Sequence, residues 1–279
     1  MEKSYNASKI TKKILIHVIL LLLSFTMLIP FLFMISTSLK SADEVFSIPF
    51  KWFPKKVMLE NYIYMWQNAP WGRYFFNTLI ITVSVIVGQV FTSSLAAYSF
   101  SRLTFKGRDL MFFIYLGTMM IPFQVIMIPT FTIVKKLGWI NELKSVIIPA
   151  FFSPFATFLL RQFFLGIPKE LEEAAKIDGC GYPKIYWEII MKISKPALTT
   201  IAIFTFMGTW NDFIRPLIFL SRSETWTLAL GLAKFQGTYT TQWNQMMAGS
   251  LITMVPVLVV FMFGQKYFIQ GIVMSGLKE

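Results

Sequence analysis

Residues 14–35 read ILIHVILLLLSFTMLIPFLFMI, in which His17 is the only ionisable side chain. A helix needs about 20 such residues to cross a bilayer, because every backbone N–H and C=O must find its partner inside the segment. The run exceeds the roughly 7–15 apolar residues of a secretory signal, and no small-residue cleavage site follows it. Four lysines precede it: Lys3, Lys9, Lys12 and Lys13. We therefore predict a retained first transmembrane helix whose basic end lies in the cytoplasm.

Five further apolar stretches match the first in length and character. The composition suits a chain in the bilayer, since 55% of the 279 residues are hydrophobic and only 14% are charged. We predict an all-α, polytopic membrane protein with about six transmembrane helices. Their expected bounds are residues 14–35, 74–95, 111–134, 146–165, 198–220 and 251–269.

The net charge of +12 is spread over short segments between the apolar runs instead of forming one basic face. Membrane topology explains this pattern better than nucleic-acid binding, so no nucleic-acid partner is expected. Compact basic clusters lie in residues 1–13, 101–109 and 166–197 and in the C-terminal tail, which places both termini in the cytoplasm by the positive-inside rule. Six tryptophans fall in the opposite segments, where their rings suit the membrane interface: Trp52, Trp66, Trp71, Trp139, Trp226 and Trp243. The expected organisation is a cytoplasmic N-terminus, residues 1–13, and a single transmembrane domain, residues 14–279.

Prolines lie inside several of the predicted spans. Pro122 and Pro129 fall in the third and Pro154 in the fourth, and each removes a helix hydrogen bond. Such breaks are compatible with a gated pathway, and equally with static kinks that shape helix packing.

Residues 167–183 read IPKELEEAAKIDGCGYP and predict a short capped helix in the cytoplasmic segment. Pro168 suits a first helical position, the glutamates suit the positive N-terminal end, and Lys176 lies one turn after Glu172. Gly179 suits the left-handed conformation that ends a helix.

The short helix carries a stripe of small and apolar residues. Leu171, Ala174 and Ala175 are spaced i, i+3 and i+4, and alanine lets another surface approach the backbone closely. The stripe favours docking to a partner, although an amphipathic helix resting on lipid headgroups is an alternative. Pro183 suits the opening of a second short helix.

The same segment resembles the hallmark of the inner-membrane permeases of ABC importers. That hallmark is a Glu-Ala-Ala triplet, a step to Asp-Gly and a distant proline. Here it is Glu173-Ala174-Ala175, Asp178-Gly179 and Pro196.

The resemblance covers nearly the whole chain and narrows to the carbohydrate branch, in the maltose-type second permease. It also rests on weaker motifs in the same order: NTL at 77–79, AAYSFSR at 96–102, GRD at 107–109, MMIP at 119–122, GWIN at 138–141, FLLRQF at 158–163, WNDF at 210–213 and GQKY at 264–267.

The resemblance implies the type I permease fold of ABC importers, in which residues 166–197 would form coupling helices that seat in a cleft of a separate ATPase subunit. Many relatives carry a second proline where this chain has Lys192, which bears on the geometry of the second short helix. By the resemblance, Ala174, Ala175 and Gly179 would be buried contacts in the cleft, and Glu173 and Asp178 polar anchors. The complete set of expected coupling residues is Leu171, Glu173, Ala174, Ala175, Asp178, Gly179 and Pro196.

The resemblance also implies partners. These are a second homologous permease subunit, two ABC ATPase subunits, and an extracellular or periplasmic solute-binding protein that delivers a sugar or related polyol. ATP and magnesium would be used by the ATPase subunits, so no cofactor is expected in this chain. The chain itself is expected to be a transport subunit of a prokaryotic cell membrane and not an enzyme.

Four polar or amphipathic residues in or near the spans are candidates for the translocation pathway. A polar group in hydrocarbon is costly and tends to face a cavity or a partner. Alternatives are a structural Asp212 to Arg215 pair and, for Gln124, a hydrogen bond between helices. The candidates are Gln124, Trp210, Asn211 and Asp212.

The residue inventory argues against other chemistry. A single Cys180 and a single His17 offer no metal-ligand cluster and no nucleophile with its base, so neither a metal site nor a catalytic site is expected. No Gly-rich phosphate-binding loop occurs. An ion-coupled secondary transporter would need intramembrane carboxylates or histidines, and apart from Asp212 the spans hold almost none. A third possible function, besides the importer permease and the ion-coupled transporter, is a purely structural membrane scaffold.

Overall fold

A computed structural model describes residues 2–233, 235–236 and 241–276, with side chains for residues 12–233, 235–236 and 241–265. Within these ranges the regular structure is helical, apart from one isolated bridge between Gln236 and Thr241, so the all-α prediction is confirmed. The chain forms two compact units, Met1–Ala69 with Lys234–Ile252 and Pro70–Ala233 with Thr253–Glu279. Helix α1 (Glu2–Ser38) runs through the predicted domain boundary at residue 13, and the outermost residues of both predicted domains, 1 and 277–279, lie outside the described residues.

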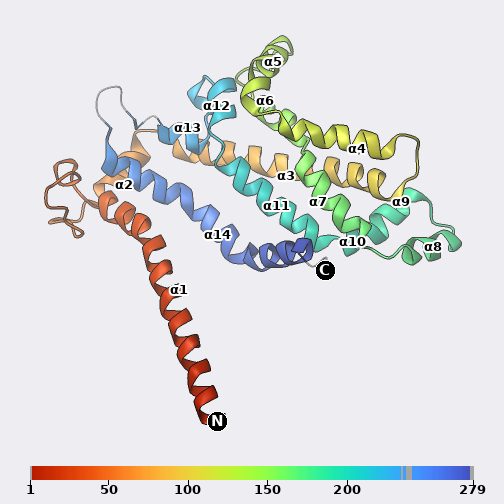
Figure 1. Ribbon diagram of the computed structural model, residues 1–279. Helices are drawn as coiled ribbons and strands as arrows, with labels where there is room; N and C mark the ends of the chain where they lie inside the picture. The colour runs from red at the N-terminus through yellow and green to blue at the C-terminus, as the bar shows by residue number, and fades with distance from the viewer. Residues whose placement is uncertain (1, 234, 237–240, 277–279) are drawn as a thin grey trace. The chain divides into compact units, whose positions relative to one another are not determined.

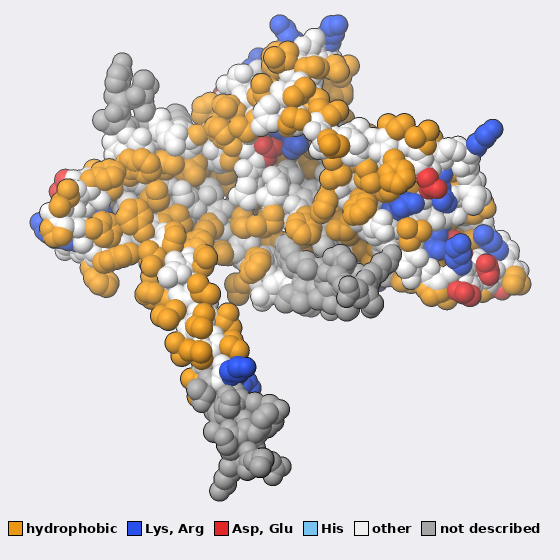
Figure 2. Space-filling view, viewed as in Figure 1, with side chains coloured by type: hydrophobic (Ala, Val, Ile, Leu, Met, Phe, Trp, Pro, Cys, Tyr) orange, Lys and Arg blue, Asp and Glu red, His pale blue; other side chains and the backbone are white. Residues whose placement is uncertain are grey.

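The first unit contains α1, η1 (Ala42–Glu44), α2 (Glu60–Gln67) and the first part of α14 (Trp243–Gly276). Helix α1 carries the first predicted span, and its large apolar side chains from Ile14 to Ile35 are exposed on all sides. Figure 2 shows these hydrophobic side chains covering the helix surface. A helix that is apolar all round needs lipid or another protein around it.

A buried amide network joins the helix ends of the first unit. The Asn61 amide donates to the carbonyl oxygens of Ser38 and Lys40, both at 2.8 Å, and Asn244 donates to the Asn61 side-chain oxygen at 2.9 Å. Lys40 itself is fully buried, with Nζ 3.8 Å from the centroid of the Phe50 ring. Removal from water lowers the pKa of the Lys40 ammonium, and the nearby Glu44 carboxylate opposes this shift.

The second unit is built around α3 (Trp71–Arg102), which packs against α7 (Pro154–Leu165) and α11 (Lys195–Trp210) (Figure 1). Gln89 bonds the carbonyl oxygen of Ala150, and Arg102 bonds that of Ile167, so α3 and α7 run in the same direction. Helix α11 runs the opposite way. Consequently α3 and α7 end, and α11 begins, at one end of this unit.

The rest of α14 also belongs to the second unit, and the other elements of this unit are shorter. They are α4 (Arg108–Gly117), η2 (Thr118–Met120), α5 (Phe123–Lys136), α6 (Lys144–Ile147), η3 (Ile148–Phe151), α8 (Glu170–Ile177), α9 (Tyr182–Ile185), η4 (Tyr186–Ile190), α10 (Met191–Ile193), α12 (Ile214–Phe219), η5 (Ser223–Thr225) and α13 (Leu228–Ala233).

Four described helical stretches are long and apolar enough to cross a membrane singly: Lys12–Ser38, Trp71–Arg102, Lys144–Leu165 and Trp243–Gln265. Two bent pairs raise the number to as many as six, in agreement with the prediction of about six. One pair joins Arg108–Met120 to Phe123–Lys136 at 99°, with Pro122 in extended conformation at the break. The other joins Tyr182–Ile193 to Lys195–Trp210 at 76°.

The fifth predicted span, residues 198–220, is wrong as one continuous helix. Helix α11 ends at Trp210 and α12 begins at Ile214. The reason is local, because the Asp212 carboxylate accepts a hydrogen bond from the backbone N–H of Arg215 and ion-pairs with its guanidinium at 3.2 Å. Asp212, one residue before the N-cap Phe213, therefore accepts a backbone N–H from the first turn of the new helix.

Polar side chains fasten the loops at the end of the second unit away from α8. The Asn77 amide donates to the carbonyl oxygens of Glu224 and Trp226, both at 2.9 Å. Asn141 has a left-handed φ of 64°, and its side-chain oxygen accepts the backbone N–H of Ser221 at 2.6 Å. Two of the short sequence motifs, NTL and GWIN, thus hold the chain that follows α12.

Candidate functional site

Helix α8 is the capped short helix predicted from the sequence. Glu170, Glu172 and Glu173 occupy its first turn, where carboxylates favour the positive end of the helix dipole. Gly179 has φ +80°, as predicted. Its N–H bonds the carbonyl of Lys176, and the next N–H bonds that of Ala175, which is the Schellman pattern that ends a helix.

Two local expectations about α8 were wrong. Pro168 lies two residues before the first helical residue, Glu170, and does not occupy the first helical position. Glu172 pairs with Arg102 in place of Lys176, whose ammonium lies 5.4 Å from the centroid of the Tyr182 ring. Glu172 pairs with Arg102 because a guanidinium suits a buried ion pair with a carboxylate.

The second short helix forms as expected but is irregular. Pro183 lies in the first turn of α9, and η4, a π-helical segment, continues it to α10. Lys192 lies in α10 and pairs with Glu188 one turn earlier. Pro196 lies in the first turn of α11 and is exposed.

Burial divides the predicted docking stripe of α8 into two faces. Leu171 and Ala174 are exposed, together with Glu173, Asp178 and Gly179. Ala175 is 7% exposed and belongs to the hydrophobic cluster of this chain, so it contacts the chain's own core and not an outer surface. The face that remains open to a partner is therefore formed by Leu171, Ala174 and the helix end.

A buried ion pair attaches α8 to α3. The Arg102 Nε and Glu172 Oε1 atoms lie 2.9 Å apart, and the two side chains are 3% and 8% exposed. Arg102 also donates to the carbonyl oxygens of Phe164 and Ile167, at the end of α7. One guanidinium thus joins three elements, α3, α7 and α8.

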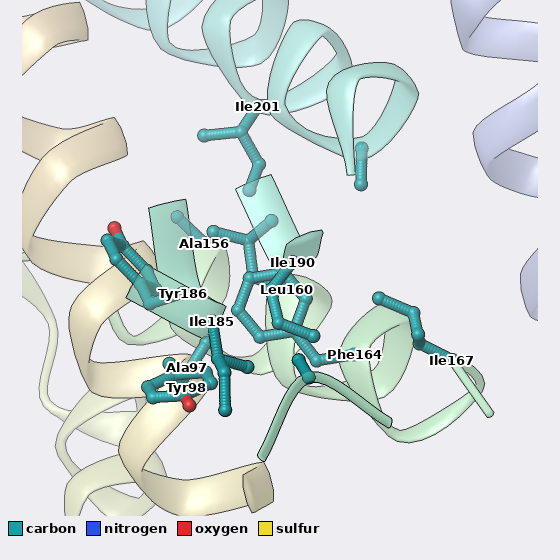
Figure 3. Close-up of a cluster of buried hydrophobic side chains, with 12 residues drawn as sticks. Ala97, Tyr98, Ala156, Leu160, Phe164, Ile167, Ile185, Tyr186, Ile190 and Ile201 are labelled. Carbon is teal, nitrogen blue, oxygen red and sulfur yellow. The ribbon is translucent and has the colours of Figure 1, made fainter. Parts of the chain in front are cut away.

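A hydrophobic cluster supports this ion pair. Figure 3 shows Leu160 and Phe164 of α7 beside Ile185 and Ile190 of the second short helix. The Tyr186 hydroxyl lies 2.7 Å from the Ser94 hydroxyl of α3, which seats the second short helix on the same span. Both short helices are consequently fixed to the membrane-length helices.

Sequence reasoning missed this pair because its members lie far apart in the chain. The only signal was the position of Arg102 at the end of a long apolar run, where a guanidinium needs a partner or water. Glu172 is one of three glutamates in the first turn of α8, and no feature of the sequence distinguishes it from the other two, which are exposed.

The predicted pathway residues do not gather in one site. Trp210 is 3% exposed, and its indole N–H donates to the Thr253 carbonyl at 3.1 Å, so it packs among helices. Asn211 and Gln124 are exposed. Asp212 forms the ion pair with Arg215 that the sequence left as an alternative.

The structure instead shows a cavity of about 220 Å³ among α3, α7 and α11. None of the four predicted pathway residues lines it. Sequence patterns missed it because the helix register that turns these side chains toward one another is set by packing. Its polar and aromatic lining includes Gln89, Ser153, Phe155, Phe204, Thr205, Thr209 and Arg215.

The second unit thus consists of membrane-length helices that carry a short, exposed, capped helix fixed to their ends, which is the architecture of a multi-pass membrane protein. The chain matches the family "Binding-protein-dependent transport system inner membrane component" over residues 89–273, and it belongs to that family.

Relatives with assigned names cover almost the whole chain. The arabinooligosaccharides transport system permease protein of Halalkalibacterium halodurans is 35% identical over 259 residues, covering 92% of this chain and 93% of the relative. The sn-glycerol-3-phosphate transport system permease protein of Yersinia enterocolitica is 31% identical, covering 93% and 95%.

A solved structure shares the fold. A chain in the crystal structure of a bacterial ABC transporter that imports the acidic polysaccharide alginate superposes with a TM-score of 0.80 at 24% identity, covering 91% of this chain and 95% of that one. The chain therefore has the type I permease fold of ABC importers and is a multi-pass membrane transport subunit.

Proposed function

We propose that this chain is one permease subunit of an ATP-driven importer for a sugar or related polyol, and that α8 receives the motion of a separate ATPase. Family membership supports the transport role. The substrate class follows relatives named as permeases for arabinooligosaccharides, diacetylchitobiose and sn-glycerol 3-phosphate.

The observation that carries the coupling role is the attachment of α8. Its outward face presents Leu171 at 43% and Ile177 at 87% exposure, a large apolar surface for one short helix. Its inward face is held by the buried pair of Arg102 and Glu172. A force on the outward face is therefore delivered to α3 and α7 together.

The residues on the outward face have distinct proposed roles. Leu171 and Ala174 supply apolar contact with the ATPase, and Glu173 and Asp178 supply charged anchors. Gly179 ends the helix so that the chain turns back, and Pro196 starts α11 after the second short helix. Ala175 supports the face from the core side.

The proposed assembly contains a second homologous permease, two ABC ATPase subunits and a solute-binding protein. A related alginate transporter was crystallised with its pentasaccharide-bound periplasmic protein, which supports the last partner. ATP and magnesium bind the ATPase subunits in this scheme. The end of the second unit that carries α8 faces the cytoplasm of a prokaryotic cell, as do both termini.

The transport cycle in this proposal is alternating access. Closure of the ATPase subunits pushes α8, and the membrane helices tilt as a body between inward-open and outward-open states. An ion-coupled mechanism is disfavoured by the family and by the near absence of unpaired carboxylates in the described spans.

Co-purification tests the proposal. Glu173→Arg on a tagged chain reverses a charge on the outward face, and we expect the ATPase subunits to be lost from the purified complex. Glu170→Arg is the matched control, because Glu170 is also exposed in the first turn of α8 and lies outside the proposed contact set. Retention of stoichiometric ATPase by Glu173→Arg, or sugar transport by the chain alone, would contradict the proposal.

A further inference from the structure

The cavity of the second unit is a partly open pocket lined by α3, α7 and α11, and it lies away from α8. Gln89 lines it from α3, and the helical rise of about 1.5 Å per residue places Gln89 about 20 Å along α3 from Arg102. Thr205 and Thr209 line it from α11. The cavity is therefore distinct from the coupling site.

One wall of the cavity is aromatic. Phe155 of α7 and Phe204 of α11 meet edge to face, with ring centroids 6.0 Å apart and an interplanar angle of 87°. Both rings are about two-fifths exposed. An apolar ring face suits the C–H face of a sugar ring.

The other walls carry hydroxyl and amide groups in fixed positions. The Gln89 amide donates to the Ala150 carbonyl at 3.0 Å and accepts from the Thr205 hydroxyl, so its orientation is set by both neighbours. Ser153 and Thr209 also line the space, and the Ser153 hydroxyl is oriented by accepting the backbone N–H of Ala156 at 3.2 Å. A small number of oriented polar groups beside an apolar wall is the usual composition of a small-molecule site.

The charge of the cavity is balanced. Arg215 is among the lining residues, and its guanidinium lies 3.2 Å from the Asp212 carboxylate and 5.2 Å from the centroid of the Phe123 ring. The pair neutralises itself, so the site offers hydrogen bonds without a net attraction for anions. This electrostatic balance favours a neutral ligand.

The pocket is small and partly open. About 220 Å³ lies below the roughly 300–1,000 Å³ of pockets that hold drug-sized ligands. A single ring or a polyol of similar size suits this space better than a whole oligosaccharide.

We infer that this cavity is a subsite for one neutral sugar ring or polyol unit on the translocation pathway. Phe155 and Phe204 pack against the ring face, while Gln89, Thr209 and Ser153 bond its hydroxyls. The inference rests on the proposed function, and it assigns to this permease a direct contact with the transported molecule.

Cysteine labelling in the assembled importer tests the subsite. Thr209→Cys is introduced with Cys180→Ser, which removes the single native cysteine, and the complex is placed in nanodiscs. A small thiol reagent is applied with glucose, arabinose or N-acetylglucosamine as neutral probes, and with glucuronate as an anionic probe. We expect at least one neutral probe to slow labelling of Thr209→Cys fivefold or more, and glucuronate to have a smaller effect.

Matched variants separate binding from general effects. Thr199→Cys, on the same helix and half-buried like Thr209, should label at the same rate with and without sugar. Adding Phe155→Leu should abolish the protection, whereas Phe158→Leu on the same helix should keep it. No protection by any neutral probe, stronger protection by glucuronate, or equal protection of Thr199→Cys would overturn the inference. ATPase co-purification from the same sample tells a failed subsite from a failed proposed function.

Discussion

At the scale of single residues, Arg102 matters most for the coupling site. Its guanidinium contacts the Glu172 carboxylate and the carbonyl oxygens that end α7. Removing one member of a buried ion pair leaves the other charge without compensation and costs about 3–5 kcal/mol, whereas replacing both with apolar groups is often neutral. The pair therefore matters less for net stability than for holding α8 in one position.

The single variant at Arg102 should be destabilised, and the double variant at Arg102 and Glu172 should regain most of the lost stability. Arg102→Met should lower the unfolding midpoint of the purified chain by an amount equivalent to about 3–5 kcal/mol. Adding Glu172→Met should restore most of that loss, while ATPase-coupled uptake stays low because α8 has lost its attachment. Arg108→Met is the control, because its pair with Asp109 is largely open to solvent, at 28% and 61% exposure, and contributes only about 0–1 kcal/mol. A double variant as unstable as the single one would argue against the compensation.

At the scale of elements, the end of α8 is set by one glycine. Gly179 has φ +80°, and no atom lies within 4 Å of the position that a Cβ would take. A substitution there meets backbone strain alone, which is about 1–2 kcal/mol for a non-glycine residue in this conformation. Asparagine tolerates the left-handed region better than alanine or valine.

We therefore expect a graded effect on ATPase binding. Gly179→Ala should weaken the affinity of the permease complex for the ATPase about fivefold to thirtyfold, if the strain is released by fraying of α8. Gly179→Asn should have a smaller effect, and Gly179→Val an effect at least as large as alanine. Titration of labelled ATPase onto permease in nanodiscs measures these affinities. Equal affinities for all three variants would show that the cap does not position the docking face.

Some helix ends in this chain could be predicted from the sequence. Helix ends set by local chemistry, such as the glycine end of α8 and the Pro183 start of α9, are readable because the signal and its effect are neighbours in the chain. The polar residues Asn211 and Asp212 marked the break after Trp210 in the sequence. One long helix was predicted because apolar residues dominate on both sides of them. Both residues lie at the break between α11 and α12.

At the scale of the whole molecule, apolar run lengths predict the membrane helices well because the bilayer imposes one length on all of them. They do not predict how sharply Pro122 bends the third span, since that angle depends on packing around the break. The cavity could not be predicted from the sequence either. Gln89 and Thr205 belong to different spans, and only the packing of α3 on α11 brings them together.

The sidedness and accessibility of the outward face of α8 test the central claim most directly. Ala174→Cys with Cys180→Ser gives a single exposed thiol on that face, which a membrane-impermeant reagent can report in oriented vesicles. We predict labelling in inside-out vesicles only, and at least tenfold slower labelling once the ATPase subunits are bound. Labelling in right-side-out vesicles, or labelling that ATPase binding leaves unchanged, would contradict the account.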